Sequence, residues 1–310
     1  MTMDETTFAT LTETHRRELR VHCYRLLGSA QEAEDLVQET FLRAWRGRDG
    51  YAGKATFRAW LYKIATNACL DVLDRRPPVP AETPSAVAIP WLTPCPADFL
   101  ADLVVARETI ELAFLTAMQH LPARQRAALV LRDVLGWSAR ETAAALDTSV
   151  AAANSALQRA RDTMRDRLPD RRTEWSAPAD PEELAVVRTY MAALEKGDEQ
   201  ALGAMLAEDA RCGQAPGAGG NMTDQPYWYA GRDTLVAGWA PVLDGSVRFR
   251  CVLTSANHEP AVATYIRASD TEGPFAAFGL TVLAVRDGRI AELTVYPPAL
   301  YPAFGLPLSR

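Results

Sequence analysis

Residues 136–161, GWSARETAAALDTSVAAANSALQRAR, place hydroxyl, amide and guanidinium side chains on segments with helical periodicity. Ser138 followed by Glu141 is an S-x-x-E capping box, which predicts a helix from Ser138 to about Leu146. Residues 147–149 form a turn, and apolar residues at helical spacing predict a second helix after it. This arrangement predicts a helix-turn-helix, whose second helix enters the major groove of DNA.

The face of the second helix opposite its apolar stripe carries the candidate DNA contacts. In a helix-turn-helix the early turns meet base edges, and later basic residues meet phosphates. We therefore predict base contacts from Ser155, Gln158 and Arg159, and phosphate contacts from Arg161, Arg165 and Arg167. Asp162 lies on the same face and opposes DNA binding. The alternative interpretation is a solvated face of an ordinary bundle helix.

The chain as a whole is acidic, with a formal net charge of -6. Basic and acidic residues balance over residues 1–175, so the negative excess lies entirely in the C-terminal part. A neutral N-terminal part with local basic clusters is compatible with phosphate binding, whereas the acidic remainder is not. Because no apolar run of membrane-spanning length and no secretory signal is present, we expect a soluble, cytoplasmic protein.

The five cysteines are far apart and form no C-x-x-C pair. This spacing does not fit a zinc site or a dense disulfide framework. We predict free, mostly buried thiols, no metal and no cofactor.

Two proline-rich breaks divide the chain. Seven prolines lie between residues 77 and 96, where they block helix and strand alike, and EWSAPADPEE at 174–183 makes a shorter break. Helical periodicity precedes each break, and β-rich runs follow two helical stretches after residue 184. Asp287-Gly288 between two of these runs predicts a hairpin.

The expected fold is multidomain, with two all-α domains followed by an α+β domain. The predicted limits are 8–76 for the first helical domain, 77–97 for a linker, 98–172 for the second helical domain and 180–310 for the α+β domain.

The stretch from Glu108 to Leu168 resembles region 4 of sigma-70 family sigma factors. It joins LPARQRAALVLRDVLGWSARETAAAL, at 121–146, to NSALQRAR at 154–161. The resemblance implies recognition of the upstream (minus-35) promoter element and docking on the flap of the RNA polymerase β subunit. Asn154 and Ala156 stand where the family more often has basic residues, so we expect this module alone to bind DNA weakly.

The segment SAQEAEDLVQETFLRAWR, at 29–46, resembles sigma region 2.2, which grips the coiled coil of the polymerase β′ subunit. An acidic and amide surface with one apolar anchor suits a basic helical partner. The predicted core polymerase contacts are Asp35, Gln38, Glu39 and Leu42. An ordinary soluble helix is the alternative for this segment taken alone.

The segment FRAWLYKIATNACLDVLDRR, at 57–76, resembles regions 2.3 and 2.4 of the group 4, or extracytoplasmic-function (ECF), sigma factors, which recognise and melt the downstream (minus-10) element. The preceding loop, 47–57, resembles their base-capturing loop. We predict a base-edge contact from Asn67 and phosphate contacts from Lys54, Arg58, Lys63, Arg75 and Arg76. Trp60 is expected in the core.

The ECF resemblance covers residues 8–170, and IPWLTPCPADFL at 89–100 resembles a motif of ECF subfamilies that carry a C-terminal extension. The last domain resembles the SnoaL-like branch of the NTF2-like fold, which closes a curved sheet into a conical pocket. The candidate pocket residues are Tyr190, Asp209, Trp228, Tyr229, Tyr265 and His258, although His258 fits a turn better. We expect a regulatory, ligand-sensing role without catalysis, and a mobile loop at the glycine-rich 213–226.

Three functions follow from these patterns. The first is a sigma factor whose partners are core RNA polymerase (β′ coiled coil and β flap) and promoter DNA, with its activity modulated in cis by a C-terminal domain that senses an unknown small ligand. The second is a polymerase-independent, ligand-sensing helix-turn-helix regulator. The third is a SnoaL-like enzyme with a helical appendage. The 29–46 helix separates the first two, because a plain regulator does not need it.

Overall fold

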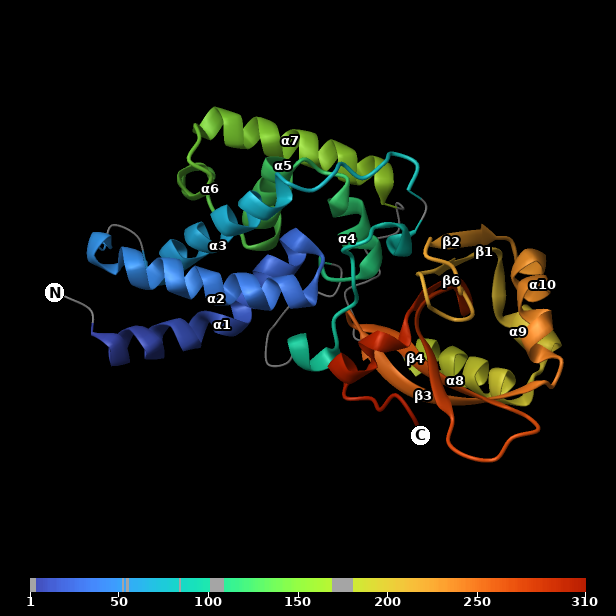
Figure 1. The fold of residues 1–310 in the computed structure, drawn as a ribbon. Coiled ribbons are helices and arrows are strands. Elements are labelled where there is room, and N and C mark those ends of the chain that lie inside the picture. The colour runs from blue at the N-terminus through green and yellow to red at the C-terminus, as the bar shows by residue number, and fades with distance from the viewer. Residues whose placement is uncertain (1–3, 52, 54–55, 84, 101–108, 169–180) are drawn as a thin grey trace. The chain divides into compact units, whose positions relative to one another are not determined.

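The computed structural model describes residues 4–51, 53, 56–83, 85–100, 109–168 and 181–310. The chain forms two compact units, and Figure 1 labels most of their helices and strands. The first unit comprises Met1–Ala81, Trp91–Pro94 and Asp98–Trp175, and the second comprises Glu82–Pro90, Cys95–Ala97 and Ser176–Arg310. None of the helices in the described ranges is long and apolar enough to cross a membrane.

The first unit begins with a bundle of three helices, α1 (Glu5–Leu27), α2 (Ala30–Gly47) and α3 (Phe57–Leu73). Each begins at a capping side chain: Asp4, Ser29 and Thr56 each accept a hydrogen bond from a backbone N–H in the first turn. Short helical turns follow α2 (η1, Arg48–Gly50) and lie on either side of Trp91 and Leu92, the tryptophan-leucine motif (η2, Ala86–Ala88; η3, Ala97–Leu100). All three long helices pack against one another and bury a continuous apolar core.

His22 of α1 lies fully buried inside this bundle. Its Nε2 is 2.9 Å from Thr66 Oγ1, and its ring packs against Tyr62 with 4.9 Å between ring centroids. Burial, together with the positive charges of Arg25 and Arg58, lowers the pKa of His22 to about 3. His22 is therefore neutral in the folded chain at neutral pH. In the unfolded chain, where the side chain is solvated, its pKa is about 6.5.

This difference predicts acid sensitivity of the first unit. Between the two pKa values only the unfolded chain binds the His22 proton, so the free energy of unfolding should fall by about 2 kcal/mol from pH 7 to pH 5. Urea unfolding at pH 7, 6 and 5 measures this change, with His22→Gln as the comparison. An equal pH dependence in the variant would contradict the assignment.

The first unit continues with α4 (Leu112–Gln119), α5 (Ala123–Leu129), a π-helical turn η5 (Val130–Val134), α6 (Ala139–Ala145) and α7 (Val150–Arg167). The predicted capping box is confirmed: Ser138 Oγ accepts from the Glu141 N–H, and the Glu141 carboxylate accepts from the Ser138 N–H. Asp147 turns the chain between α6 and α7 with φ 47°. The predicted helix-turn-helix is therefore present.

Helices α6 and α7 pack against each other through small residues. Ala145 and Ala156 are buried, whereas Ala144 and Val150 are exposed. The capping residue Ser149 sets where α7 begins, so Val150 lies in its first turn, outside the seam. Ala156, by contrast, packs into this seam.

Arg126 and the tryptophan-leucine motif connect the two halves of the first unit. The buried Arg126 guanidinium donates to the carbonyl oxygens of Leu26, Gln119 and Leu121. Trp91 Nε1 donates to the Gln119 side chain at 2.9 Å. At Gly28, whose φ is 75°, a Cβ would lie 2.8 Å from Leu92, so only glycine admits the motif at the end of α1.

The second unit is a six-stranded sheet in the order β2-β1-β6-β5-β4-β3. Its strands are β1 (Leu206–Gln214), β2 (Tyr227–Ala230), β3 (Val247–Ala256), β4 (Glu259–Ala268), β5 (Ala276–Arg286) and β6 (Arg289–Tyr296). The β1 and β6 strands pair in parallel and the others are antiparallel. The predicted hairpin is confirmed, because Asp287 and Gly288 both have positive φ between β5 and β6.

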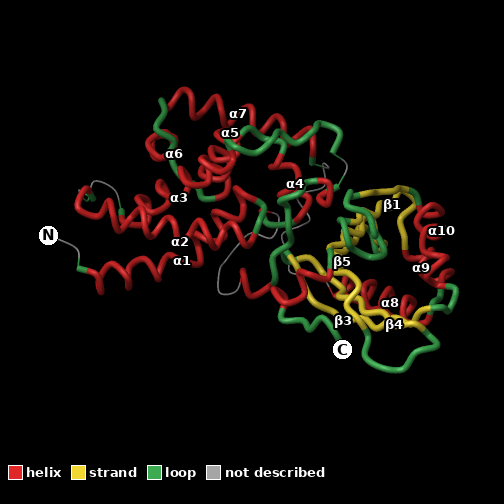
Figure 2. The backbone as a smooth tube through the Cα atoms, viewed as in Figure 1, coloured by secondary structure: helices red, strands yellow, loops and turns green. Residues whose placement is uncertain are grey.

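Helices α8 (Pro181–Lys196), α9 (Glu199–Met205) and α10 (Arg232–Leu243) complete this unit, and η7 (Pro298–Phe304) follows the last strand. Figure 2 shows them beside the curved sheet, where α8 packs on β3, β4 and β5 and α10 packs on β1 and β2. The predicted α+β architecture of the C-terminal part is thus confirmed.

Parts of the predicted linker belong to the second unit. Asn257, in the β3–β4 turn, accepts a hydrogen bond from the Cys95 N–H at 2.9 Å and donates its own backbone N–H to the Cys95 carbonyl. The segment around Ser85 packs on β1 and β6, and a Cβ at Gly213 would lie 2.4 Å from Ser85 Oγ. The chain between the two helical modules is therefore held by the sheet at these points. The predicted domain limits stay predictions.

Candidate nucleic-acid interface and ligand cavity

The candidate DNA face of α7 is exposed. Ser155 and Arg159 project to solvent and have no hydrogen-bond or ion-pair partner among the described residues. Gln158 Nε2 and Arg165 Nη1 both donate to the Asp162 carboxylate, at 3.1 and 3.2 Å. The sequence-predicted side chains therefore share one face, but Asp162 neutralises part of it.

Arg161 and Arg167, two of the predicted phosphate contacts, already have partners. Arg161 makes a two-pronged ion pair with Asp133, at 2.9 and 2.7 Å, and Arg167 donates to the Ala81 carbonyl. The Arg161 side chain is nevertheless 46% exposed.

Removal of Asp162 should strengthen DNA binding. In Asp162→Ala, Gln158 and Arg165 are released and one negative charge leaves the face, so we expect about five-fold tighter binding and a salt dependence steeper by up to about one ion. Fluorescence anisotropy of a random-sequence duplex with the full-length chain, at several salt concentrations, measures both. The matched control is Asp166→Ala, which removes an exposed carboxylate of the same helix. Equal gains in the two variants would mean that only net charge matters.

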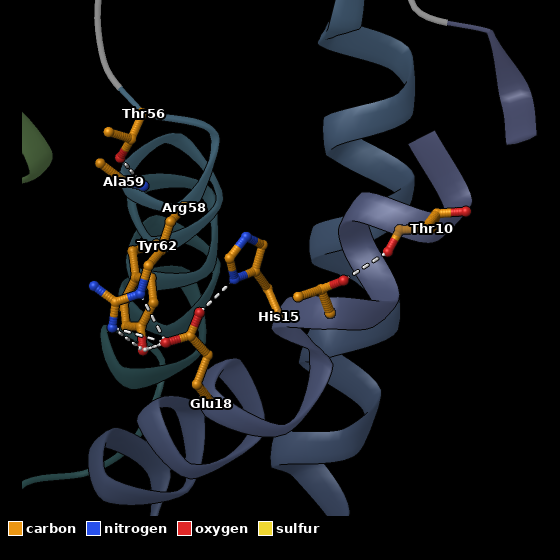
Figure 3. A network of polar contacts seen from close by, with 8 residues as sticks. Thr10, His15, Glu18, Thr56, Arg58, Ala59 and Tyr62 are labelled. Atoms are coloured by element: carbon orange, nitrogen blue, oxygen red, sulfur yellow. Dashed lines mark hydrogen bonds and ion pairs between the residues drawn. The ribbon is translucent and has the colours of Figure 1, made fainter. Parts of the chain in front are cut away.

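On α3, the predicted phosphate contact Arg58 lies in a polar network, shown in Figure 3. Its Nη2 is 2.7 Å from the Glu18 carboxylate, and its guanidinium also lies over the Tyr62 ring. Glu18 in turn contacts His15 Nδ1 at 2.5 Å and the Tyr62 hydroxyl at 3.2 Å. The ion pair with Arg58 and the hydrogen bond with His15 hold the pKa of Glu18 low against the opposing effect of burial. Arg58 is therefore paired but still at the surface.

The other predicted DNA contacts near α3 differ in their surroundings. Lys63 Nζ lies 2.5 Å from Asp147 Oδ1, in the turn of the helix-turn-helix. Asn67 is half-buried one turn further along, and Arg75 is exposed just after the helix. Lys54 lies outside the described residues.

The prediction for Arg76 needs correction. Its side chain is only 11% exposed, donates to the Leu27 carbonyl and the Glu32 carboxylate, and lies over the Trp91 ring. The adjacent tryptophan motif covers this arginine. Arg76 therefore packs the interior of the first unit and does not face a DNA backbone.

The predicted polymerase face of α2 is largely free. Asp35, Gln38 and Leu42 are exposed on one side of the helix, and the Leu42 side chain is 51% exposed. Glu39 is half-buried and accepts from Arg43 at 2.8 Å, and Arg43 also contacts Asp71 at 3.0 Å. An apolar side chain surrounded by acid and amide groups thus stands unburied on a rigid helix.

In the second unit, a cavity of about 580 Å³, counted with its open mouth, lies between the sheet and helices α8 and α10. Its wall includes Tyr190, Cys212, Gln214, Trp239, Thr264 and Thr281. Among its described lining residues none is acidic, basic or a histidine. Burial raises the pKa of Cys212 to about 11 and also raises that of Tyr190, so both stay neutral.

Of the predicted pocket residues, only Tyr190 lines this cavity. Strand alternation sends Asp209 outward on β1, where it is 70% exposed and pairs with Arg286. Trp228 is 49% exposed, and Tyr265 lies on the opposite face of β4 from Thr264, with its hydroxyl donating to the Pro307 carbonyl. Tyr229 contacts Gln214 at the edge, and His258 lies in the β3–β4 turn with φ 62°, as the turn interpretation predicted.

The glycine-rich loop 213–226 also differs from expectation, because it forms part of the cavity wall. Gly219 lines the cavity and donates its N–H to the Phe278 carbonyl. The buried Asn221 amide donates to the carbonyls of Gln214, Ala215 and Gln225. Sequence reasoning took the glycines as a sign of mobility and missed Asn221, whose amide ties the loop together.

Comparison with known families assigns each part of the chain. Residues 11–77 match sigma-70 region 2, residues 111–164 match sigma-70 region 4, and residues 187–293 match the SnoaL-like domain. The first two matches cover α2, α3 and most of α7, and the third covers all the described cavity-lining residues except Val295.

Relatives extend these matches to the whole chain. The chain is 40% identical to the ECF RNA polymerase sigma factor SigG of Mycobacterium tuberculosis, over 97% of this chain and 84% of that protein. It is 30% identical to the ECF sigma factor SigW of Bacillus subtilis, over 54% of this chain and 91% of SigW. The crystal structure of M. tuberculosis ECF sigma factor SigJ superimposes with a TM-score of 0.62 at 25% identity, covering 97% of this chain and 99% of SigJ. The chain therefore belongs to the extracytoplasmic-function sigma factors of the sigma-70 family and carries a SnoaL-like C-terminal domain.

Proposed function

We propose that this sigma factor docks on the β′ coiled coil of core RNA polymerase through Asp35, Gln38, Glu39 and Leu42 of α2. The observation that carries this proposal is the exposed Leu42 side chain among acid and amide groups. Exposed apolar anchors with a polar rim form the centres of protein interfaces. The negative rim complements a basic helical partner and steers its approach.

The promoter is recognised by two separate faces of the first unit. Ser155, Gln158 and Arg159 of α7 contact bases of the upstream element, and Arg161 and Arg165 contact phosphates. Asn67 contacts the downstream element, with Lys63, Arg58 and Arg75 on its backbone. Region 4 also contacts the polymerase β flap. The low positive charge of α7 is compatible with this role, because docking on the polymerase contributes additional binding free energy.

Lys63 and Asp147 join these two faces directly, since their side chains form an ion pair. Two promoter elements separated along a duplex cannot both be contacted while α3 touches the turn of the helix-turn-helix. The first unit must therefore open at this ion pair when the holoenzyme engages a promoter.

Run-off transcription tests the proposal. Core polymerase with the full-length chain is supplied with a genomic fragment library, and transcripts are sequenced. We expect a set of start sites that share two upstream elements. Transcripts no different from those of core polymerase alone would overturn the proposal.

The second unit regulates the first in cis, without catalysis. The described cavity wall offers no carboxylate or imidazole for acid-base chemistry. The segment between the two helical modules is partly built into the second unit, through Asn257 and Cys95 and through Ser85 against Gly213. A change in the sheet is thereby transmitted to the chain that joins the promoter-recognising modules.

Asn257→Gly tests this connection. Glycine keeps the positive φ of the turn and removes the side chain that accepts from Cys95, so we expect at least a two-fold change in promoter-dependent transcription. The matched control is His258→Gly at the next position of the same turn, which should leave transcription unchanged. The same activity in both variants and the unmodified chain would refute the transmission through Asn257.

A further inference from the structure

The cavity of the second unit has a chemical character that specifies its ligand. It lies between the sheet and helices α8 and α10 and opens to solvent at its mouth. Aromatic and aliphatic side chains from α8, α10 and the strands supply most of its wall, among them Leu194, Phe249, Phe278 and Leu293. Such a wall gains free energy by covering apolar surface of a guest.

Charge is missing from the described part of this wall. Asp209 and Arg286 pair on the outside of the sheet, at 3.2 Å, and Glu292 lies on the face of β6 opposite the lining Leu293. An ionised ligand group would lose its hydration and find no counter-charge among the described lining residues. The cavity therefore selects against carboxylates, phosphates and ammonium groups.

One polar group in the wall has an unused hydrogen bond. Tyr190 is 6% exposed, and its hydroxyl has no hydrogen-bond partner among the described residues. By contrast, the Gln214 amide at the other side is engaged, 2.8 Å from the Tyr227 hydroxyl and 3.3 Å from that of Tyr229. The hydroxyl of a cavity-lining tyrosine can accept a hydrogen bond from a guest or donate one to it.

We propose that the second unit binds a neutral, mainly apolar small molecule whose single hydroxyl or carbonyl group hydrogen-bonds to Tyr190. The effect of this binding on transcription rests on the regulatory role proposed above, whereas the binding itself depends only on the cavity. The ligand is held and released unchanged, since the described wall supplies no acid-base pair. Occupancy would fix the strands around Thr264 and Thr281, and β4 follows the turn that holds Cys95.

Three matched probes test the proposal on the full-length chain by isothermal titration calorimetry at pH 7. They are 2-naphthol, which is neutral and carries one hydroxyl, naphthalene, which carries none, and 2-naphthoate, which is anionic. We expect 2-naphthol to bind at least about ten-fold more tightly than 2-naphthoate. Equal or tighter binding of 2-naphthoate, or no binding of either neutral probe at millimolar concentration, would overturn the proposal.

Two tyrosine variants locate the site. Tyr190→Phe should lose about five-fold in 2-naphthol affinity and keep its affinity for naphthalene, which also shows that the variant is folded. The control is Tyr296→Phe, because the Tyr296 hydroxyl is buried without a partner in the described chain and lies outside the cavity wall. A loss of 2-naphthol affinity in Tyr296→Phe equal to that in Tyr190→Phe would refute the assignment of Tyr190. Because no polymerase is present, failure here is distinct from failure in the transcription assay.

Discussion

Leu42→Asp is expected to weaken binding of the full-length chain to core RNA polymerase by about 30-fold or more. Loss of an anchor at the centre of an interface removes about 2 kcal/mol or more of binding free energy. An aspartate at this position also adds negative charge that must be desolvated against the partner. The fold should not change, because the Leu42 side chain is 51% exposed and makes no part of the core.

The chain offers a matched control for this prediction. Leu308 is 54% exposed and lies in the second unit, so Leu308→Asp applies the same change to an equally exposed leucine. Binding of fluorescently labelled chain to purified core polymerase gives both dissociation constants. Unchanged binding of Leu42→Asp, or an equal loss in both variants, would show that α2 does not carry the contact.

Arg126→Ala is expected to lower the free energy of unfolding of the first unit by at least about 3 kcal/mol. The guanidinium is buried and makes four hydrogen bonds of 2.6–3.2 Å, to three backbone carbonyls and the Gln119 side chain. The variant leaves these acceptors buried without a donor, which costs about 1–3 kcal/mol for a group that finds no water. Although burial lowers the pKa of Arg126 to about 9, the side chain remains charged at neutral pH.

The same helix supplies the control. Arg124 is exposed and makes one hydrogen bond, to the Leu146 carbonyl at 3.0 Å, so Arg124→Ala should change stability by less than about 1 kcal/mol. Hydrogen exchange followed by mass spectrometry, with peptides from α1, α5 and the sheet, separates the two units. Exchange in α1 and α5 should accelerate in Arg126→Ala while the sheet stays protected. Full protection of α1 would mean that Arg126 does not connect the two helical modules.

The positions of the helix-turn-helix and the β5–β6 hairpin followed from the sequence because their signals are local. A capping box needs only residues three apart, and an Asp-Gly turn needs only two adjacent residues with positive φ. The same holds for the exposed face of α2, where helical periodicity placed Asp35, Gln38 and Leu42 outward. These features keep their geometry wherever the rest of the chain lies.

Arg76 shows where such reasoning fails. In the sequence it ends a basic pair after a helix predicted to recognise DNA, and nothing nearby indicates that Trp91 and Glu32 enclose it. The sequence places Asp162 on the same face of α7. Whether its carboxylate accepts hydrogen bonds from Gln158 and Arg165 depends on the rotamers of these side chains. Side-chain partnerships between distant segments require the tertiary structure, because periodicity describes one element at a time.

The sequence by itself determined the family and the order of its modules, and it located the helices on which we propose the DNA and polymerase faces. Only the tertiary structure decided the cavity: it excluded Asp209, Trp228 and Tyr265, kept Tyr190, and added Gln214, Trp239 and the loop around Gly219. The physical reason is strand alternation combined with sheet curvature. A one-residue difference in register exchanges the two faces of a strand, and the identity of the enclosed face depends on helices far away in the sequence.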